Sequence, residues 1–310
     1  MIYTVTPNPT LDITYVLEEI TFGEPVKALE VLKSPGGKGI NVSRALRAMG
    51  TDSVAVAMIG GYVGEEVLDL LHDEGLILQI AKIKSDTRTN VIILGRSDQK
   101  ELVIRAAGPP VEATETEKVT NLIFQIAQAP EILVLSGSLP PGVDDDIYYW
   151  ITMEGKSRGS KVVIDSEGPP LAEGVKACPY LIKPNILELE ELAGRKLDGE
   201  REVIDFARTL NAAGVEIVVT SLGDKGALLV TGDAALRGTV PAIRADTVGA
   251  GDSMVAGLVM GIVQGLPLER VFRIGLASSV SAVMNDGPGL AEPGSFAEAF
   301  PQVKVELVGG

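Results

Sequence analysis

The sequence predicts an α/β fold with a mostly parallel central sheet and helices packed on both faces of that sheet. The main observation is that short, nearly continuous apolar runs alternate with longer segments of helical periodicity. A second observation is the abundance of turn-forming residues, 35 glycines and 18 prolines in 310 residues. Because right-handed crossovers bring the carboxyl ends of parallel strands to one edge, we expect ligands to bind along that edge.

Six apolar runs are the predicted strands of this sheet, and six periodic segments are the predicted helices. The strands are expected at 2–6, 53–60, 131–137, 161–166, 180–185 and 216–223. The helices are expected near 40–49, 64–74, 116–128, 144–157, 187–194 and 200–213. A further apolar helix is expected near 253–266, which is too short to span a membrane.

Two segments break the alternation, at about 13–33 and about 87–106. Neither has helical spacing, and each is typical of two strands around a turn, FGEP in the first and GRSDQ in the second. We expect the two segments to form one small β-sheet that covers a site as a lid. Residues 1–310 are therefore predicted to form a single domain with the lid as two insertions.

Composition narrows the possible functions. The one cysteine, Cys178, excludes an internal disulfide and a cysteine-built zinc site, and it fits a reducing, cytoplasmic setting. The one histidine, His72, lies on a predicted surface helix, so proton transfer is left to a carboxylate, lysine or tyrosine. A net charge of −15 without a basic stripe argues against nucleic acid, and no apolar run suits a membrane.

The segment TVGAGDSMVAG, residues 247–257, places an acid where a helix begins. Gly249, Ala250 and Gly251 allow successive N–H groups to point at one spot, which suits a phosphoryl group at a helix N-terminus. Asp252 beside them could accept a proton from an attacking hydroxyl, and its pKa need not be raised for this. A plain N-cap would explain Asp252 alone, but it would not explain the three small residues before it.

The segment SPGGKGINVSRAL, residues 34–46, also leads into a helix. Glycines such as Gly37 allow a ligand to approach the backbone, Lys38 offers a point charge, and Asn41 can bind hydroxyls. The alternative is an ordinary glycine-rich turn. The spacing matches neither a Walker loop nor a dinucleotide fingerprint, which argues against NAD.

In KPNILELEEL, residues 183–192, Asn185 and Glu188 could hold Mg²⁺ directly or through water. A capping box is the alternative for this pair. Asp12 follows the first strand and could bind sugar hydroxyls, and Arg88 suits a terminal phosphate. If the ligands are phosphates, positive charge must be concentrated locally. Lys27, Lys38, Arg88 and Arg105 could provide it, although each alone is typical of a solvated surface.

Five motifs in this order resemble the ribokinase-like (PfkB) carbohydrate kinase family: PGGKGINVSRAL, SGSLPPG, KPNILELEEL, SLGDKGAL and TVGAGDSMVAG. The resemblance extends over nearly the whole chain. It is greatest for the phosphofructokinase branch, which contains 1-phosphofructokinases, tagatose-6-phosphate kinases and minor 6-phosphofructokinases. The resemblance implies a ribokinase-like α/β core with a β-lid, the cofactors ATP and Mg²⁺, and phosphoryl transfer to a ketohexose phosphate.

The resemblance also implies roles for residues at matching positions. Asp252 would be the general base, and Gly249, Ala250 and Gly251 would form the anion hole. The sugar phosphate would be held by Asp12, Lys27, Gly37, Lys38, Asn41, Arg88, Asn90 and Ser138. The ATP site would be lined by Lys183, Asn185, Ser221, Gly223 and Gly226, with Asn285 near the adenine. Glu188, with Asn185, would organise the Mg²⁺.

The resemblance favours fructose 1-phosphate as the acceptor, with fructose 1,6-bisphosphate as the product. Lys38 is found in the 1-phosphofructokinase and tagatose types, whereas the minor 6-phosphofructokinase has a glycine there. Arg105 departs from the small polar residue that is usual in 1-phosphofructokinases, so fructose 6-phosphate and tagatose 6-phosphate stay open as acceptors. A non-catalytic sugar-phosphate or nucleotide sensor is the alternative of another class. The exposed edges of a lid sheet also suggest a homodimer through the lid.

Overall fold

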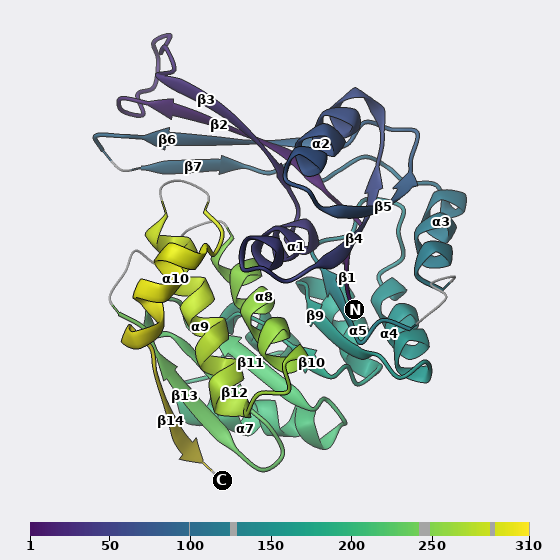
Figure 1. The fold of residues 1–310 in the computed structure, drawn as a ribbon, viewed down its shortest axis with the longest axis vertical. Helices are drawn as coiled ribbons and strands as arrows, with labels where there is room; N and C mark the ends of the chain where they lie inside the picture. The colour runs from purple at the N-terminus through teal and green to yellow at the C-terminus, as the bar shows by residue number, and fades with distance from the viewer. Residues whose placement is uncertain (99, 125–128, 242–248, 286–288, 310) are drawn as a thin grey trace.

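The structure is a computed structural model that describes residues 1–98, 100–124, 129–241, 249–285 and 289–309. Within these residues the strands form a large sheet and a separate small sheet (Figure 1). Seven neighbouring strands of the large sheet are parallel: β11 (Ile217–Ser221), β10 (Leu181–Ile182), β9 (Lys161–Asp165), β8 (Ile132–Ser136), β1 (Ile2–Thr6), β4 (Ser53–Ile59) and β5 (Ile77–Lys82). Three antiparallel strands extend it beyond β11: β12 (Ala227–Val230), β13 (Ala235–Thr239) and β14 (Lys304–Gly309).

All six predicted strands are confirmed as members of the parallel part. Strands β5 and β14 were not predicted, because both are edge strands in which polar residues interrupt any continuous apolar run. The short hairpin of β12 and β13 also escaped prediction, although β12 itself is fully buried.

Helices cover both faces of the large sheet, as expected. One apolar core joins the sheet to a layer of five helices: α3 (Ala113–Phe124), α4 (Ile147–Ser157), α5 (Gly168–Lys176), α6 (Ile186–Ala193) and α7 (Gly199–Ala212). The opposite face carries α1 (Lys38–Ala48), α2 (Gly61–Asp73), α8 (Ala250–Val263), α9 (Leu268–Met284) and α10 (Pro293–Ala299). Helix α8 packs between α1 and α9 and is buried from Asp252 to Ile262, which explains its nearly uniform apolar sequence.

The small sheet is formed by both segments that the sequence predicts as a lid. Its order is β3 (Glu30–Gly36), β2 (Thr10–Leu17), β6 (Arg88–Gly95) and β7 (Glu101–Ile104). Strands β2 and β6 are parallel, and Asp12 is paired in register with Asn90. The lid stands off the main body, and Figure 1 shows β7 passing above the ends of α8 and α9.

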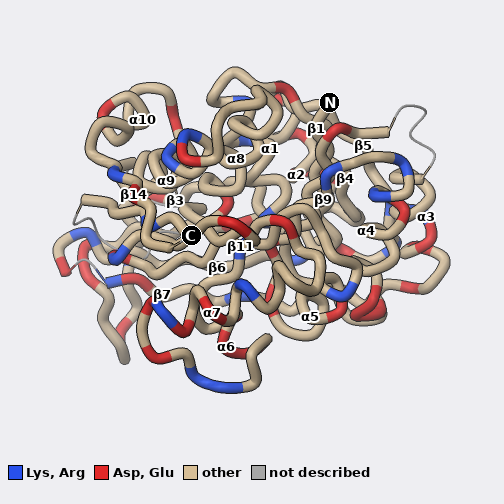
Figure 2. Tube along the Cα trace, turned by 90° about the horizontal axis from the view of Figure 1, so that it is seen from below, with Lys and Arg blue, Asp and Glu red and all other residues tan. Residues whose placement is uncertain are grey.

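Charged residues are interspersed over the outer segments (Figure 2). His72 is exposed on α2, as its sequence pattern predicts. Among the described residues, none of the helices combines the length and the apolar character needed to cross a bilayer.

Candidate active site

The candidate site lies along the carboxyl edge of the parallel sheet, where ligands bind in folds of this kind. Each of five neighbouring strands ends in, or is closely followed by, a polar residue of the site. These residues are Asn8 after β1, Ser138 after β8, Asp165 at the end of β9, Lys183 after β10 and Ser221 at the end of β11.

Helices α1 and α8 begin at this edge, and each begins after a glycine with positive φ. The φ values are +113° at Gly37 and +98° at Gly249. A Cβ on Gly249 would lie 2.6 Å from the carbonyl oxygen of Gly289, so a side chain does not fit there. The Asn41 amide of α1 donates a 2.8 Å hydrogen bond to Asp252 Oδ2 of α8, which ties the two helix starts together.

The N-terminus of α8 has the form of an anion site. The first helical hydrogen bond runs from Ser253 N–H to Gly249 C=O. The N–H groups of Ala250, Gly251 and Asp252 have no acceptor among the described residues, as expected for a first turn. Asp252 does not cap its own helix, because the N-cap residue is Gly249 and the carboxylate accepts its bond from Asn41. The N-cap alternative for Asp252 therefore does not hold.

Residue Asp252 is 6% exposed, and the pKa of its carboxyl is raised to about 6. Burial is the main cause, and the negative charge of Asp165 adds to it. Lys38, the hydrogen bond from Asn41 and Lys183 oppose the rise. A carboxylate with a pKa about one unit below neutral pH is mostly ionised there, yet it accepts a proton more readily than an exposed aspartate.

Asp165 is the functional residue that the sequence reasoning missed. Its carboxylate is 1% exposed, and its Oδ1 lies 3.4 Å from Lys38 Nζ and 3.3 Å from Lys183 Nζ. Although burial raises the pKa of Asp165, the two ammonium groups hold it below its ordinary value. A Cβ on Gly251 would lie 3.4 Å from Lys183 Nζ, so this ammonium faces the start of α8. The signal in the sequence that could have indicated Asp165 is an acid at the carboxyl end of the buried run KVVIDS.

Asn185 and Glu188 form the capping box that was the alternative to a metal site. Glu188 N–H donates to Asn185 Oδ1 at 2.9 Å, and Asn185 N–H donates to Glu188 Oε2 at 2.8 Å. Burial raises the pKa of Glu188, which Lys38 opposes. Asp165 Oδ2 is buried without a partner among the described residues.

These two carboxylates fit the preference of Mg²⁺ for oxygen ligands, which one or two acids usually supply together with substrate phosphates. Within the described ranges no group of three or more His, Cys, Asp or Glu side chains could hold a metal ion by itself. Glu188 and Asp165 are therefore the residues that would hold a phosphate-bound Mg²⁺. The positive charge of the ion would offset the negative charge of the phosphates.

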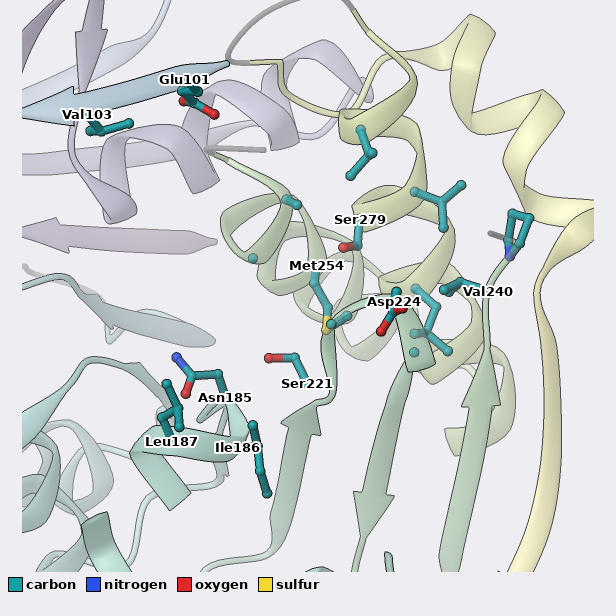
Figure 3. A pocket seen from close by; sticks show the side chains of 18 of the residues that line it. Glu101, Val103, Asn185, Ile186, Leu187, Ser221, Asp224, Val240, Met254 and Ser279 are labelled. Carbon is teal, nitrogen blue, oxygen red and sulfur yellow. The ribbon is translucent and has the colours of Figure 1, made fainter. Parts of the chain in front are cut away.

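A cavity of about 510 Å³ opens beside the start of α8 and suits a nucleotide (Figure 3). Asn185 and Ser221, which are joined by an isolated β-bridge, lie on its wall with Gly223, Gly226 and Gly251. Its apolar lining includes Met254, Val240, Leu276, Val280 and Val283. Asn285, predicted to lie near the adenine, is not among the described lining residues; its side-chain amide donates a 2.7 Å hydrogen bond to the Leu290 carbonyl.

The predicted sugar-binding residues meet at the base of the lid. Asn90 donates to Asp12 Oδ1 at 2.9 Å, and burial raises the pKa of Asp12. Arg88 donates to the carbonyls of Ala106 at 2.6 Å and Asn8 at 2.9 Å. Asn8 also donates to Ser138 Oγ at 3.3 Å, which links the lid to the main sheet.

Lys27 is not brought to this site within one chain. It is exposed in the loop between β2 and β3, beyond the end of the hairpin where Val16 pairs with Glu30. Asp12 is four residues away from Val16 along β2, which corresponds to roughly 13 Å of extended strand. The sequence motif gave no information on this separation, because it showed only that Lys27 belonged to the lid.

Comparisons with known proteins agree with this geometry. Residues 8–293 match the model of the pfkB family of carbohydrate kinases. The chain is 37% identical over 306 residues to a 1-phosphofructokinase of Bacillus subtilis (98% of this chain, 99% of the relative). It is 30% identical over 309 residues to a tagatose-6-phosphate kinase of Staphylococcus epidermidis (98% and 99%). The structure of Escherichia coli phosphofructokinase-2 in complex with substrates and products matches with a TM-score of 0.92 at 30% identity (97% and 98%).

These relatives match the chain over nearly their full length, the first in sequence and the last in fold as well. The chain is therefore a sugar-phosphate kinase, and it belongs to the pfkB family of carbohydrate kinases.

Proposed function

We propose that this protein transfers the terminal phosphate of ATP to fructose 1-phosphate and forms fructose 1,6-bisphosphate. The observation that carries the proposal is the buried Asp252 carboxylate, bonded to Asn41 and adjacent to the free N–H groups that begin α8. This arrangement offers a proton acceptor and an anion seat side by side, which is what in-line phosphoryl transfer to a hydroxyl requires.

The residues divide the work according to their position. Asp12, Asn41 and Asn90 would bind the hydroxyls of the sugar, with Gly37 and Lys38 at the start of α1. Arg88 and Ser138 would bind the phosphate that the sugar already carries. As the acceptor oxygen attacks, its proton would pass to Asp252, while Lys183 and the N–H groups of Ala250 and Gly251 would stabilise the charge on the moving phosphoryl group.

Fructose 1-phosphate is proposed as acceptor because the 1-phosphofructokinase of B. subtilis is more similar to this chain than the tagatose-6-phosphate kinases. A coupled ADP-release assay with fructose 1-phosphate, fructose 6-phosphate and tagatose 6-phosphate tests the choice. We expect the highest kcat/KM with fructose 1-phosphate. A higher value with either 6-phosphate would overturn the choice of acceptor, and ADP release with none of the three would favour a non-catalytic sensor.

We also propose that residues 1–310 act as one domain whose lid pairs with that of a second copy. The lid exposes apolar side chains of both hairpins, including Phe22 (88% exposed), Val31 (50%) and Ile104 (53%). Light scattering coupled to gel filtration should give about twice the chain mass of 32.5 kDa, and a monomer would refute the pairing. Because its proposed substrates are phosphorylated metabolites, we expect the protein to act in the cytoplasm.

A further inference from the structure

Arg105 lies where the lid meets the nucleotide cavity. Glu101, Val103 and Arg105 line this cavity, whereas Leu102 and Ile104 between them do not line it and are exposed to solvent. This is the alternation of a β-strand, so one face of β7 is turned toward the cavity. Figure 3 shows Glu101 and Val103 on that face, at the side of the cavity opposite Asn185.

The backbone beside Arg105 is held by residues of the predicted sugar site. The N–H of Ala106 donates to Asn90 Oδ1 at 3.1 Å, and the C=O of Ala106 accepts the 2.6 Å bond from Arg88. Pairing of Val91 with Ile104 places Arg105 opposite Asn90 when the register is continued by one residue. Arg105 is therefore the cavity-lining residue of the lid that lies nearest to Asp12 and the acceptor side.

The Arg105 side chain is exposed, and it makes no hydrogen bond or ion pair with any described residue. Burial lowers the pKa of the nearby Arg88 guanidinium, and the positive charge of Arg105 lowers it further, whereas Asp12 opposes both effects. Two neighbouring guanidinium groups repel each other. An anion that enters the cavity mouth would offset this repulsion by attracting the positive charge of Arg105.

The two ends of the cavity indicate which anion this is. Val240, Leu276 and Val280 form an apolar end that suits a base, whereas Gly251 and the start of α8 suit phosphates. Glu101 begins β7 and Arg105 directly follows its end, so the two residues are four positions apart, roughly 13 Å by the rise of a strand. A carboxylate suits the end away from the phosphates, and Arg105 occupies the end between the nucleotide and the acceptor.

We infer that Arg105 binds the terminal phosphate of the nucleotide, the group that is transferred, from the lid side of the cavity. The inference rests on the proposed use of ATP. A guanidinium can bind two oxygens of one phosphate and offsets the charge that spreads over them during transfer. The lid would then take part in selecting a nucleotide that still carries its terminal phosphate, besides covering the sugar.

The test compares two nucleotides that differ by one phosphate. Calorimetry would measure the Kd of adenylyl imidodiphosphate, a non-hydrolysable ATP analogue, and of ADP for the wild type, Arg105→Met, Arg105→Lys and the control Arg96→Met. Arg96 is an exposed lid arginine in the turn between β6 and β7. We expect Arg105→Met to weaken the analogue about 10- to 100-fold and ADP less than about threefold, with Lys intermediate and Arg96→Met unchanged.

Equal weakening of both nucleotides by Arg105→Met would overturn the assignment, and so would an unchanged Kd for the analogue. Weaker binding of fructose 1-phosphate with unchanged nucleotide affinity would also overturn it, because Arg105 would then serve the acceptor. The proposed function is tested separately by ADP release from the wild-type enzyme. A wild type that binds the analogue but releases no ADP would refute the kinase reaction and leave the Arg105 comparison interpretable.

Discussion

Asp252→Asn should make the protein more stable at neutral pH while it removes most of the activity. The ionised Asp252 carboxylate is disfavoured in the folded state, because its pKa rises from 3.8 to about 6 on burial. At 1.36 kcal/mol per pKa unit, this rise lowers the free energy of unfolding by about 3 kcal/mol once the pH exceeds 6. Asparagine is neutral and similar in shape, and it can still accept the hydrogen bond from Asn41.

The pH dependence gives this prediction its sign. Well below the unfolded pKa of 3.8 the carboxyl is protonated in both the folded and unfolded states, and the penalty is absent. The penalty grows as the pH rises from there to the folded pKa of about 6. Urea unfolding should therefore show an excess stability of the variant of about 3 kcal/mol at pH 8, which falls to about half of that value at pH 5. Asp52→Asn, at a surface acid that is 70% exposed, is the matched control and should differ little from wild type.

The same variant should bind ATP nearly normally and lose about 10²- to 10⁴-fold in turnover, because the proton acceptor is gone. Two results would refute the reasoning. If the variant gains no stability at pH 8, or if the gain does not shrink toward pH 5, the raised pKa is wrong. If turnover stays near the wild-type value, the role of Asp252 as base is wrong.

Three further predictions follow from the same geometry. The wild-type kcat/KM should rise with pH through about 6, as Asp252 ionises. Because Lys38 lowers the Asp252 pKa, Lys38→Met should move this rise to higher pH. A rise at an unchanged pH would contradict the electrostatic interaction between Lys38 and Asp252. Gly249→Ala should lower the free energy of unfolding by about 1–3 kcal/mol more than Gly265→Ala, measured by thermal unfolding. Both glycines have positive φ, but only Gly249 has a carbonyl oxygen 2.6 Å from where a new Cβ would lie. Equal losses of stability would argue against that steric conflict. Glu188→Gln should raise the Mg²⁺ concentration for half-maximal rate about 10-fold or more, whereas Glu191→Gln, exposed on the same helix, should leave it unchanged.

Most of the parallel sheet was predictable because its strands are buried on both faces and leave uninterrupted apolar runs in the sequence. The lid was predictable for a different reason: the segments near 13–33 and 87–106 lacked helical spacing where a helix would otherwise have been expected. The edge strands β5 and β14 carried neither signal. Helix α5 begins with Gly168 and two prolines, which hid a nine-residue helix behind turn formers.

The site was predictable where a motif is local, as in the glycines and the acid at the start of α8. Asp165 was missed because its role depends on two lysines that are far away in the sequence, one from α1 and one after β10. Asn185 and Glu188 show the reverse difficulty, because a local motif fitted both a capping box and a metal site. Where Lys27 lies relative to Asp12 depends on the length of a hairpin, which composition does not give.

Asp165 also explains how a chain with a net charge of −15 can hold phosphates. Its buried carboxylate fixes Lys38 and Lys183 beside the starts of α1 and α8. Burial lowers the pKa of the Lys38 ammonium, but the neighbouring carboxylates, Asp165 foremost, outweigh this effect and raise it. The same negative charge raises the pKa of Asp252, so one acid both positions the cations that attract phosphate and makes the neighbouring carboxylate more basic. Replacing Asp165 by asparagine would therefore weaken two functions at once: the lysines would lose their anchor, and the pKa of Asp252 would fall.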